Sequence, residues 1–150
     1  MAVVTEKRKS IIGKNVPFVD ARQKVMGKAE YLNDIEFPNM LFGKILRSSQ
    51  PHAKIVNIDI SKAAALPGVK AVITGLDAPK TNFGLMVPDV NIFAGEKVRY
   101  VGDEVAAVAA VDEETAQKAI ELIEVTYEKL PGVFDTNKAM EDNSPLVHEN

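Results

Sequence analysis

The sequence predicts an α+β domain with one core, and three observations carry this prediction. Strand, turn, strand, helix and strand signals follow one another over residues 97–133. Residues 53–60 alternate apolar and polar side chains, which is typical of a strand with one buried face. Hydrophobic residues make up 46% of the 150 residues, which is enough for a single buried core. The rest of the chain is therefore expected to pack around residues 97–133.

The first half of that segment predicts a hairpin whose second strand is buried. Val98 and Tyr100 alternate with charged neighbours, and Gly102-Asp103 supplies a tight turn. Residues 105–111 are an unbroken run of valine and alanine that is too short for a typical helix. Because alanine has little bulk, we expect a helix and another element to approach this strand closely on its two faces.

The second half predicts a helix followed by a strand. Asp112 stands at an N-cap position, and Glu113 and Glu114 follow near the positive end of the helix dipole. Over residues 113–123, apolar side chains recur at helical spacing in one stripe that should face the sheet: Ala116, Ala119, Ile120 and Ile123. Residues 125–128 return to strict alternation and predict a further strand.

Shorter patterns predict the remaining elements. Strands are expected at 40–47, 53–60 and 69–74, and a short helix at 62–66, capped by Ser61. Residues 13–28 have no helical or strand periodicity and are expected to lie extended on the surface. Residues 77–94 contain two prolines, a glycine and scattered apolar side chains, and predict a long loop.

Four large apolar residues of that loop must be buried against something: Phe83, Leu85, Met86 and Val87. Two interpretations stay open at this point. Either these side chains close the core of this domain, or they dock on another domain. The second interpretation predicts a weak homodimer of the isolated chain through this surface, since exposed apolar patches commonly mark contact sites.

Composition excludes several classes of function. A formal net charge of −3 provides no basic field for nucleic acid or anionic lipid. Without cysteine, the chain has no disulfide, no thiolate zinc site, no cysteine-ligated iron–sulfur cluster and no thiol nucleophile. No apolar run of about 18 residues and no signal-peptide pattern is present. We expect a cytoplasmic chain that binds neither nucleic acid nor membrane.

No residue is assigned to catalysis, to a cofactor or to a metal. His52 and His148 are the only histidines, and neither has a second ligand at metal-site spacing. We interpret His52 as a turn residue bonded to backbone and His148 as a solvated tail residue. The acidic run 112–114 is explained by the start of a helix. Ser48 and Ser49 have no base in any recognisable motif.

Several stretches resemble a known family, in the same order and with compatible spacing. The most specific are KVMGKA at 24–29, Arg47-Ser48 followed by HAKI at 52–55, LPGV at 66–69, and Val101-Gly102 followed by VAAV at 105–108. With residues 19–79 and 97–131 around them, they resemble the N-terminal α/β hammerhead domain of the molybdenum-binding large subunit of the xanthine dehydrogenase and aldehyde oxidase family. Phe18, Asn39 and Gly132 depart from the usual pattern and leave the subfamily open.

The resemblance implies an α/β hammerhead, with a mixed β-sheet and two helices, over residues 13–140. An N-terminal arm at 1–12 would precede it, and residues 141–150 would begin a linker to molybdenum-cofactor domains. The full enzyme would hold molybdopterin cytosine dinucleotide on those domains, with iron–sulfur clusters and FAD on partner domains or subunits. The implied partners are therefore the molybdenum-cofactor domains of the same polypeptide and an iron–sulfur subunit or domain.

Two functions follow as hypotheses. The first is a fragment of a molybdopterin-dependent oxidoreductase with a structural, interdomain packing role and no activity in isolation. The second is a free-standing, non-catalytic protein-interaction module that uses the same fold. The polar loop in which the sequence stops, at 148–150, favours the first hypothesis.

Overall fold

The computed structural model describes residues 12–148, which form two compact units that meet in sequence between Pro38 and Asn39. The predicted N-terminal arm at 1–12 lies outside the described residues except for Ile12. The last two residues of the predicted linker at 141–150 also lie outside them. The two units are described one after the other.

The first unit contains the helix α1 (Ala21–Val25) and the 3-10 helix η1 (Leu32–Asp34). In α1 the backbone N–H of Lys24 donates to the Asp20 carbonyl at 3.0 Å, and the Lys24 ammonium lies 2.5 Å from the Asp20 carboxylate. The prediction that residues 13–28 are extended is therefore wrong at α1. A five-residue helix is too short to produce a recognisable apolar period, so the pattern could not reveal it.

The second unit contains six strands in two three-stranded sheets. In the first sheet, in the order β1-β5-β3, lie β1 (Phe42–Arg47), β5 (Glu104–Ala110) and β3 (Val69–Thr74). In the second, in the order β4-β2-β6, lie β4 (Lys97–Val98), β2 (Ala53–Asp59) and β6 (Glu124–Lys129). The predicted α+β hammerhead is confirmed, but its described strands pair only antiparallel, in two sheets rather than one mixed sheet.

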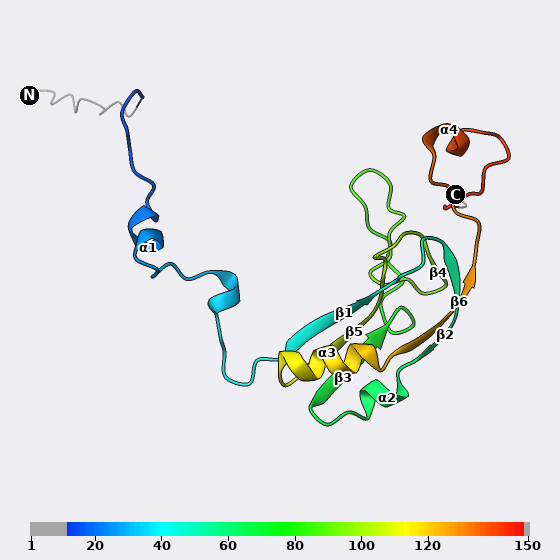
Figure 1. Cartoon of the computed structure of the whole chain (residues 1–150), viewed down its shortest axis with the longest axis horizontal. Coiled ribbons are helices and arrows are strands. Elements are labelled where there is room, and N and C mark those ends of the chain that lie inside the picture. The colour runs from blue at the N-terminus through cyan, green and yellow to red at the C-terminus, as the bar shows by residue number, and fades with distance from the viewer. Residues whose placement is uncertain (1–11, 149–150) are drawn as a thin grey trace, which may run out of the picture. The chain divides into compact units, whose positions relative to one another are not determined.

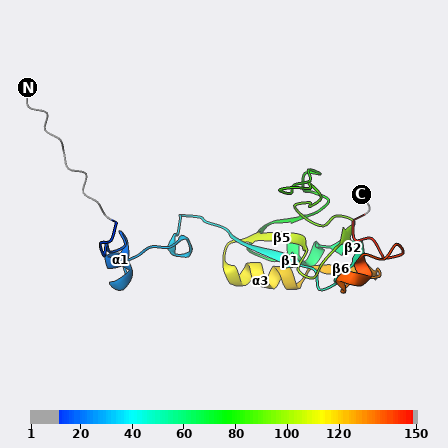
Figure 2. The same ribbon diagram turned by 90° about the horizontal axis from the view of Figure 1, so that it is seen from above.

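Both predicted helices pack on one face of the β1-β5-β3 sheet. They are α2 (Ser61–Ala64) and α3 (Glu113–Glu121), and a further turn, α4 (Thr136–Ala139), follows β6. α3 runs across β1, β5 and β3 (Figure 1), on the side opposite to the loop that follows β3 (Figure 2). The core between helices and sheet is made of small and branched side chains: Ala63, Ala106, Val108, Ala119 and Ile123.

A second core lies against the β4-β2-β6 sheet. Its buried members come from β2, β4, β5 and the segment before β4: Ala53, Ile55, Ala94, Val98 and Val105. Ile58 and Val125 pack against both cores. The two sheets are therefore held together by shared apolar contacts, without a continuous ladder of strands.

The predicted hairpin between residues 97–100 and 105–111 is wrong, because β4 pairs with β2 and not with β5. The turn between them exists, and Gly102 has φ +100° there. Its backbone is held by the residue that follows β1: Gly102 N–H donates to the Ser48 carbonyl, and Ser48 N–H donates to the Asp103 carbonyl, both at 2.8 Å. The chain thus changes sheets at the turn, and a neighbour distant in sequence decides the pairing.

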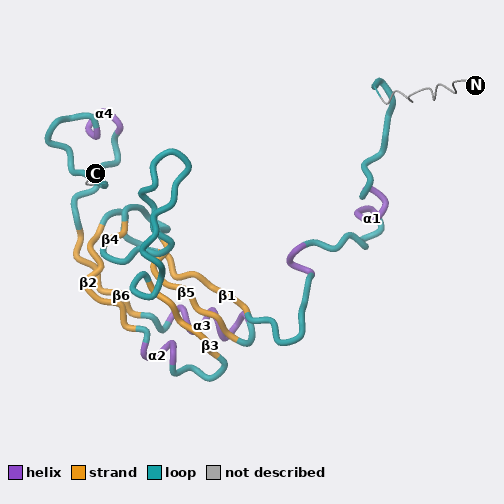
Figure 3. Tube along the Cα trace, turned by 180° about the vertical axis from the view of Figure 1, so that it is seen from behind, coloured by secondary structure: helices purple, strands orange, loops and turns teal. Residues whose placement is uncertain are grey.

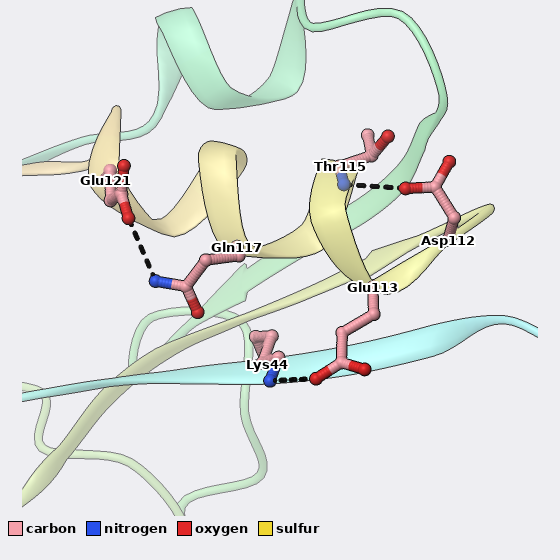
Figure 4. A network of polar contacts seen from close by, with 6 residues as sticks. All are labelled: Lys44, Asp112, Glu113, Thr115, Gln117 and Glu121. Carbon is pink, nitrogen blue, oxygen red and sulfur yellow. Dashed lines mark hydrogen bonds and ion pairs between the residues drawn. The ribbon is translucent and has the colours of Figure 1, made fainter.

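The N-terminus of α3 confirms the predicted cap. The backbone N–H of Thr115 donates to Asp112 Oδ1 at 2.7 Å, and this bond lowers the pKa of the Asp112 carboxyl. One residue on, the Lys44 ammonium of β1 lies 2.6 Å from Glu113 Oε1 and lowers the pKa of that carboxyl (Figure 4). The ion pair is exposed, so it fixes orientation more than it adds stability.

The predicted cap of α2 is wrong. Ser61 is the first helical residue rather than the cap, and its backbone N–H donates to Asp59 Oδ1 at 2.9 Å. A hydrogen bond from the Ser61 hydroxyl, together with this backbone bond, lowers the pKa of Asp59. The carboxylate at the end of β2 thus takes the position that the sequence pattern gave to a hydroxyl.

The alanines of β5 were predicted to pack closely on both faces, and this is wrong for one face. Ala106 and Ala110 are fully buried, whereas Ala107 and Ala109 alternate to the other side and are half-buried. Their cross-strand neighbours on that side are Gly43 and Ile45 of β1 and Ala71 and Ile73 of β3. The helices α2 and α3 both lie on the other face of the sheet.

Replacing Ala106 by leucine is expected to lower the free energy of unfolding by about 1–3 kcal/mol, because the added atoms have no room under α3. Ala109→Leu adds the same atoms on the open face and should cost no more than about 0.5 kcal/mol, as for an exposed site such as Glu121→Ala. Urea denaturation of the three variants measures the difference. Equal losses for both leucine variants would contradict the one-sided packing.

Candidate functional site

The loop between β3 and β4 is closed at its neck by Gly75. A Cβ atom on Gly75 would lie 2.6 Å from the carbonyl oxygen of Ala94, so only glycine lets the two ends of the loop meet this closely. Beside it, the backbone N–H and the hydroxyl of Thr74 both donate to Asp77 Oδ2 at 2.9 Å. These two bonds lower the pKa of Asp77. The loop is thus anchored although it is long.

The tip of this loop carries the apolar residues whose burial the sequence left open. Phe83 and Val90 form an isolated bridge, with N···O distances of 2.8 and 3.1 Å. The loop that contains them, between β3 and β4, is the long teal loop of Figure 3. Leu85 and Met86 are more than nine-tenths exposed, and Phe83 and Val87 are more than half exposed. The interpretation in which these four side chains close the core of this domain is therefore wrong.

A cavity of about 400 Å³ lies at the base of the loop. Its walls come from β2, from both arms of the loop and from the residues on either side of β4. Four cationic side chains line it, with Glu96 as the one carboxylate among the described lining residues: Lys54, Lys80, Lys97 and Arg99. Phe93 and Leu130 add apolar wall. The site is therefore positively charged although the whole chain is negative.

Arg99 is placed between two cavities. It lines the first and also a smaller one of about 180 Å³, which it shares with Asp89 and His148. Its Nε is buried and has no hydrogen-bond partner among the described residues. His148 is exposed, as expected of a tail residue, but its Nδ1 lies 3.4 Å from Asp89 Oδ2. This contact, which the sequence did not predict, ties the C-terminal segment to the loop.

His52 and Ser48 have structural roles. His52 is buried, and its Nδ1 lies 2.6 Å from the carbonyl oxygen of Pro131, which confirms the predicted bond to backbone. The buried Ser48 hydroxyl donates to the Gln50 carbonyl and accepts from the Gln50 N–H, at 3.0 and 2.9 Å. A hydroxyl engaged in its own turn is a poor nucleophile, and no base is bonded to it among the described residues.

A cluster of polar side chains holds the turn after β4. Arg47 Nη1 donates to the Gly102 carbonyl at 2.8 Å and to Glu104 Oε1 at 2.6 Å, while Tyr100 donates to Glu104 Oε2 at 3.3 Å. Asp103 Oδ2 accepts the Arg99 N–H at 2.9 Å. Burial raises the pKa of Asp103, and the bond from Arg99 only partly offsets this effect. The Asp103 carboxylate therefore fixes the backbone of Arg99.

Sequence reasoning missed the cationic cavity. Its residues come from segments that are 17 to 26 positions apart along the chain, from Lys54 through Lys80 to Lys97, so no local motif joins them. The one usable signal was Lys97 and Arg99 at strand spacing, on the same side of an extended segment. Within residues 12–148, no group of three or more His, Asp or Glu side chains is placed to hold a metal ion. In the same range, no helix has the length and apolarity needed to cross a bilayer.

The fold and the sequence together define the class of protein. Residues 26–131 match the family model described as the a/b hammerhead domain of aldehyde oxidase and xanthine dehydrogenase. The match covers more than half of the chain, so the chain belongs to this family.

Relatives extend the likeness over nearly the whole chain. It is 47% identical over 131 residues to a probable xanthine dehydrogenase subunit of Bacillus subtilis, covering 87% of this chain and 18% of that protein. It is 42% identical over 139 residues to the nicotinate dehydrogenase large molybdopterin subunit of Eubacterium barkeri, covering 92% and 33%. The chain thus spans a third or less of these relatives.

Two solved structures show the same arrangement. Reconstituted CO dehydrogenase from Oligotropha carboxidovorans superposes with a TM-score of 0.83 at 44% identity, over 89% of this chain and 17% of that one. The aldehyde oxidoreductase from Desulfovibrio desulfuricans superposes with a TM-score of 0.84 at 29% identity, over 93% and 17%. In both structures this domain is a small part of a larger chain.

Asp103→Asn is expected to leave stability at pH 7 unchanged or higher, because the amide oxygen still accepts the Arg99 N–H and no charge is buried. Asp103→Ala loses the bond and should be less stable by about 1 kcal/mol. The pKa of Asp103 is raised in the folded state, so its ionised carboxylate destabilises the fold. This free-energy cost is present above the raised pKa and disappears as the pH falls through it. The difference between Asp103→Asn and the unchanged chain should therefore shrink on acidification.

Urea denaturation at pH 7 and near pH 4 measures this effect. An Asp103→Asn variant as unstable as Asp103→Ala at pH 7 would show that the charge itself stabilises the turn.

Proposed function

We propose that this chain is the hammerhead part of the large subunit of a molybdopterin-dependent oxidoreductase, and that its own role is interdomain packing. The observation that carries the proposal is the match of residues 26–131 to the hammerhead domain of this family. The relatives' names support it, because one is a large molybdopterin subunit and another belongs to a xanthine dehydrogenase. The exposed loop tip supplies the kind of surface that such packing requires.

The reaction of the complete enzyme belongs to domains outside this chain. There we expect hydroxylation or dehydroxylation at a substrate carbon, with molybdopterin cytosine dinucleotide on the following domains and iron–sulfur clusters and FAD on partner domains or subunits. The residues of this chain do not fit an iron–sulfur cluster, because there is no cysteine to ligate one. Within residues 12–148, no group of three or more His, Asp or Glu side chains is placed to hold a metal ion. That this chain holds no catalytic, cofactor-binding or metal-binding residue stays a prediction, as does its cytoplasmic location.

Reading the gene beyond Asn150 tests the proposal most directly. We expect an open frame of several hundred residues. In parallel, the 150-residue chain expressed with molybdate should contain no stoichiometric molybdenum by elemental analysis and should oxidise neither xanthine nor aldehydes. A stop codon directly after Asn150 would favour the free-standing interaction module instead. Stoichiometric transition metal in the purified chain would overturn the division of roles.

The packing role also predicts a contact through the loop tip. Burying one large apolar side chain contributes about 1.5–3 kcal/mol, so the exposed Leu85 and Met86 should drive weak self-association of the isolated chain. Sedimentation across a concentration series measures it. Leu85→Lys with Met86→Lys should abolish the dimer, while Ile12→Lys, an equally exposed change in the other unit, should leave it intact. A monomer at every concentration would contradict this prediction.

A further inference from the structure

We propose that the cationic cavity at the base of the loop binds a carboxylate carried on a flat apolar body, and that aromatic monocarboxylates are its ligand class. This proposal concerns the cavity lined by Lys54, Lys80 and Arg99, and it does not depend on the packing role of the loop tip. Three observations carry it: the charge of the lining, an unpartnered buried donor and an apolar wall.

The charge of the lining favours an anion. Lys54, Lys80 and Arg99 line the cavity, and Glu96 is the one carboxylate among its described lining residues. Glu128 faces Lys54 from β6, and Glu96 lines the cavity, yet no ion pair within residues 12–148 joins either carboxylate to Lys54 or Lys80. The cavity is therefore left with an excess of positive charge that a bound carboxylate would offset.

Arg99 supplies the specific donor. It is half-buried, and its Nε has no partner among the described residues, which is costly for a buried polar group. A guanidinium presents its N–H groups in a planar fork that matches the two oxygens of a carboxylate. Its backbone is fixed, because Arg99 N–H donates to Asp103 Oδ2 at 2.9 Å. The backbone that carries the guanidinium is thus fixed before a ligand arrives.

The apolar wall favours a ring over a bare ion. Phe93, Pro79 and Leu130 line the same cavity as the cations. Ring stacking on an aromatic face adds about 0.5–1.5 kcal/mol beyond the burial of area. The cavity volume of about 400 Å³ also lies in the range of small-molecule sites, which runs from about 300 to 1,000 Å³. A small inorganic anion would leave most of this space and wall unused.

The proposal is tested by titrating the ¹⁵N-labelled 150-residue chain with benzoate and recording ¹H–¹⁵N NMR spectra. The buffer is low in salt, and its buffering ion is a large cation. Saturable shifts are expected at the amides of Arg99, Phe93 and Lys54. Benzamide has the same ring without the charge and should bind at least about tenfold more weakly, since charge-assisted hydrogen bonds are the strong ones. Inorganic phosphate and N-acetylglutamate α-amide serve as anions without a ring and should also bind at least about tenfold more weakly.

Variants separate the cavity from general surface charge. Arg99→Gln and Lys54→Gln should each weaken benzoate binding by about tenfold, which is the effect of losing one charged contact of about 1.4 kcal/mol. Lys70→Gln removes an exposed cation of β3 that does not line the cavity and should change nothing. Lys54 is itself exposed, so its variant should fold even if the Arg99 variant does not.

Each other outcome overturns the assignment in a defined way. If benzamide binds as tightly as benzoate, the negative charge of the carboxylate does not contribute to binding. Equal binding of phosphate would reduce the cavity to an adventitious ion site. Binding of N-acetylglutamate α-amide as tight as that of benzoate would identify it as an anchor for an acidic side chain of another domain. If Lys70→Gln weakens benzoate binding as much as Lys54→Gln does, the net charge of the chain alone attracts the ligand.

Discussion

The close approach of α3 to β5 is the constraint on which the rest of this domain depends. Ala106 and Ala110 on the strand and Ala116 and Ala119 on the helix are all fully buried, and Val108 and Ile123 complete the core around them. Such a contact tolerates no additional volume, and it brings the helix across three strands at once. The Lys44–Glu113 ion pair and the Asp112 cap then orient the start of the helix, and its end leads directly into β6.

Because both helices lie on one face of the first sheet, its other face is left for different contacts. The loop after β3 projects on that side (Figure 2), and the face carries Gly43, Ala71 and Ala109 beside the larger Ile45 and Ile73. The loop is pinned at its neck by Gly75 and Asp77, while its tip is exposed. A rigid base with an apolar tip is what a contact element requires, since little entropy is lost when it docks.

The sequence predicted the elements well and their partners less well, for a physical reason. α3 and β6 were predictable because each has a local period, and β5 because its unbroken apolar run is too short for a typical helix. The Asp112 cap was predictable because capping acts within one turn. The pairing of β4 with β2 was not, because the turn that redirects the chain is bonded to Ser48, about 50 residues earlier. The His148–Asp89 contact and the cationic cavity were missed for the same reason.

The position of the cavity relates the two proposals for this chain. Phe93 and Lys80 belong to the two arms of the loop whose tip is exposed, so any contact that moves the tip also acts on two walls of the cavity. Conversely, an anion held between Lys54 of β2 and the arm that carries Lys80 would tie the loop to the second sheet. Linkage then requires that each contact change the affinity of the other by the same factor. Under the two proposals, the domain would respond to a small molecule by changing how firmly its loop tip is held.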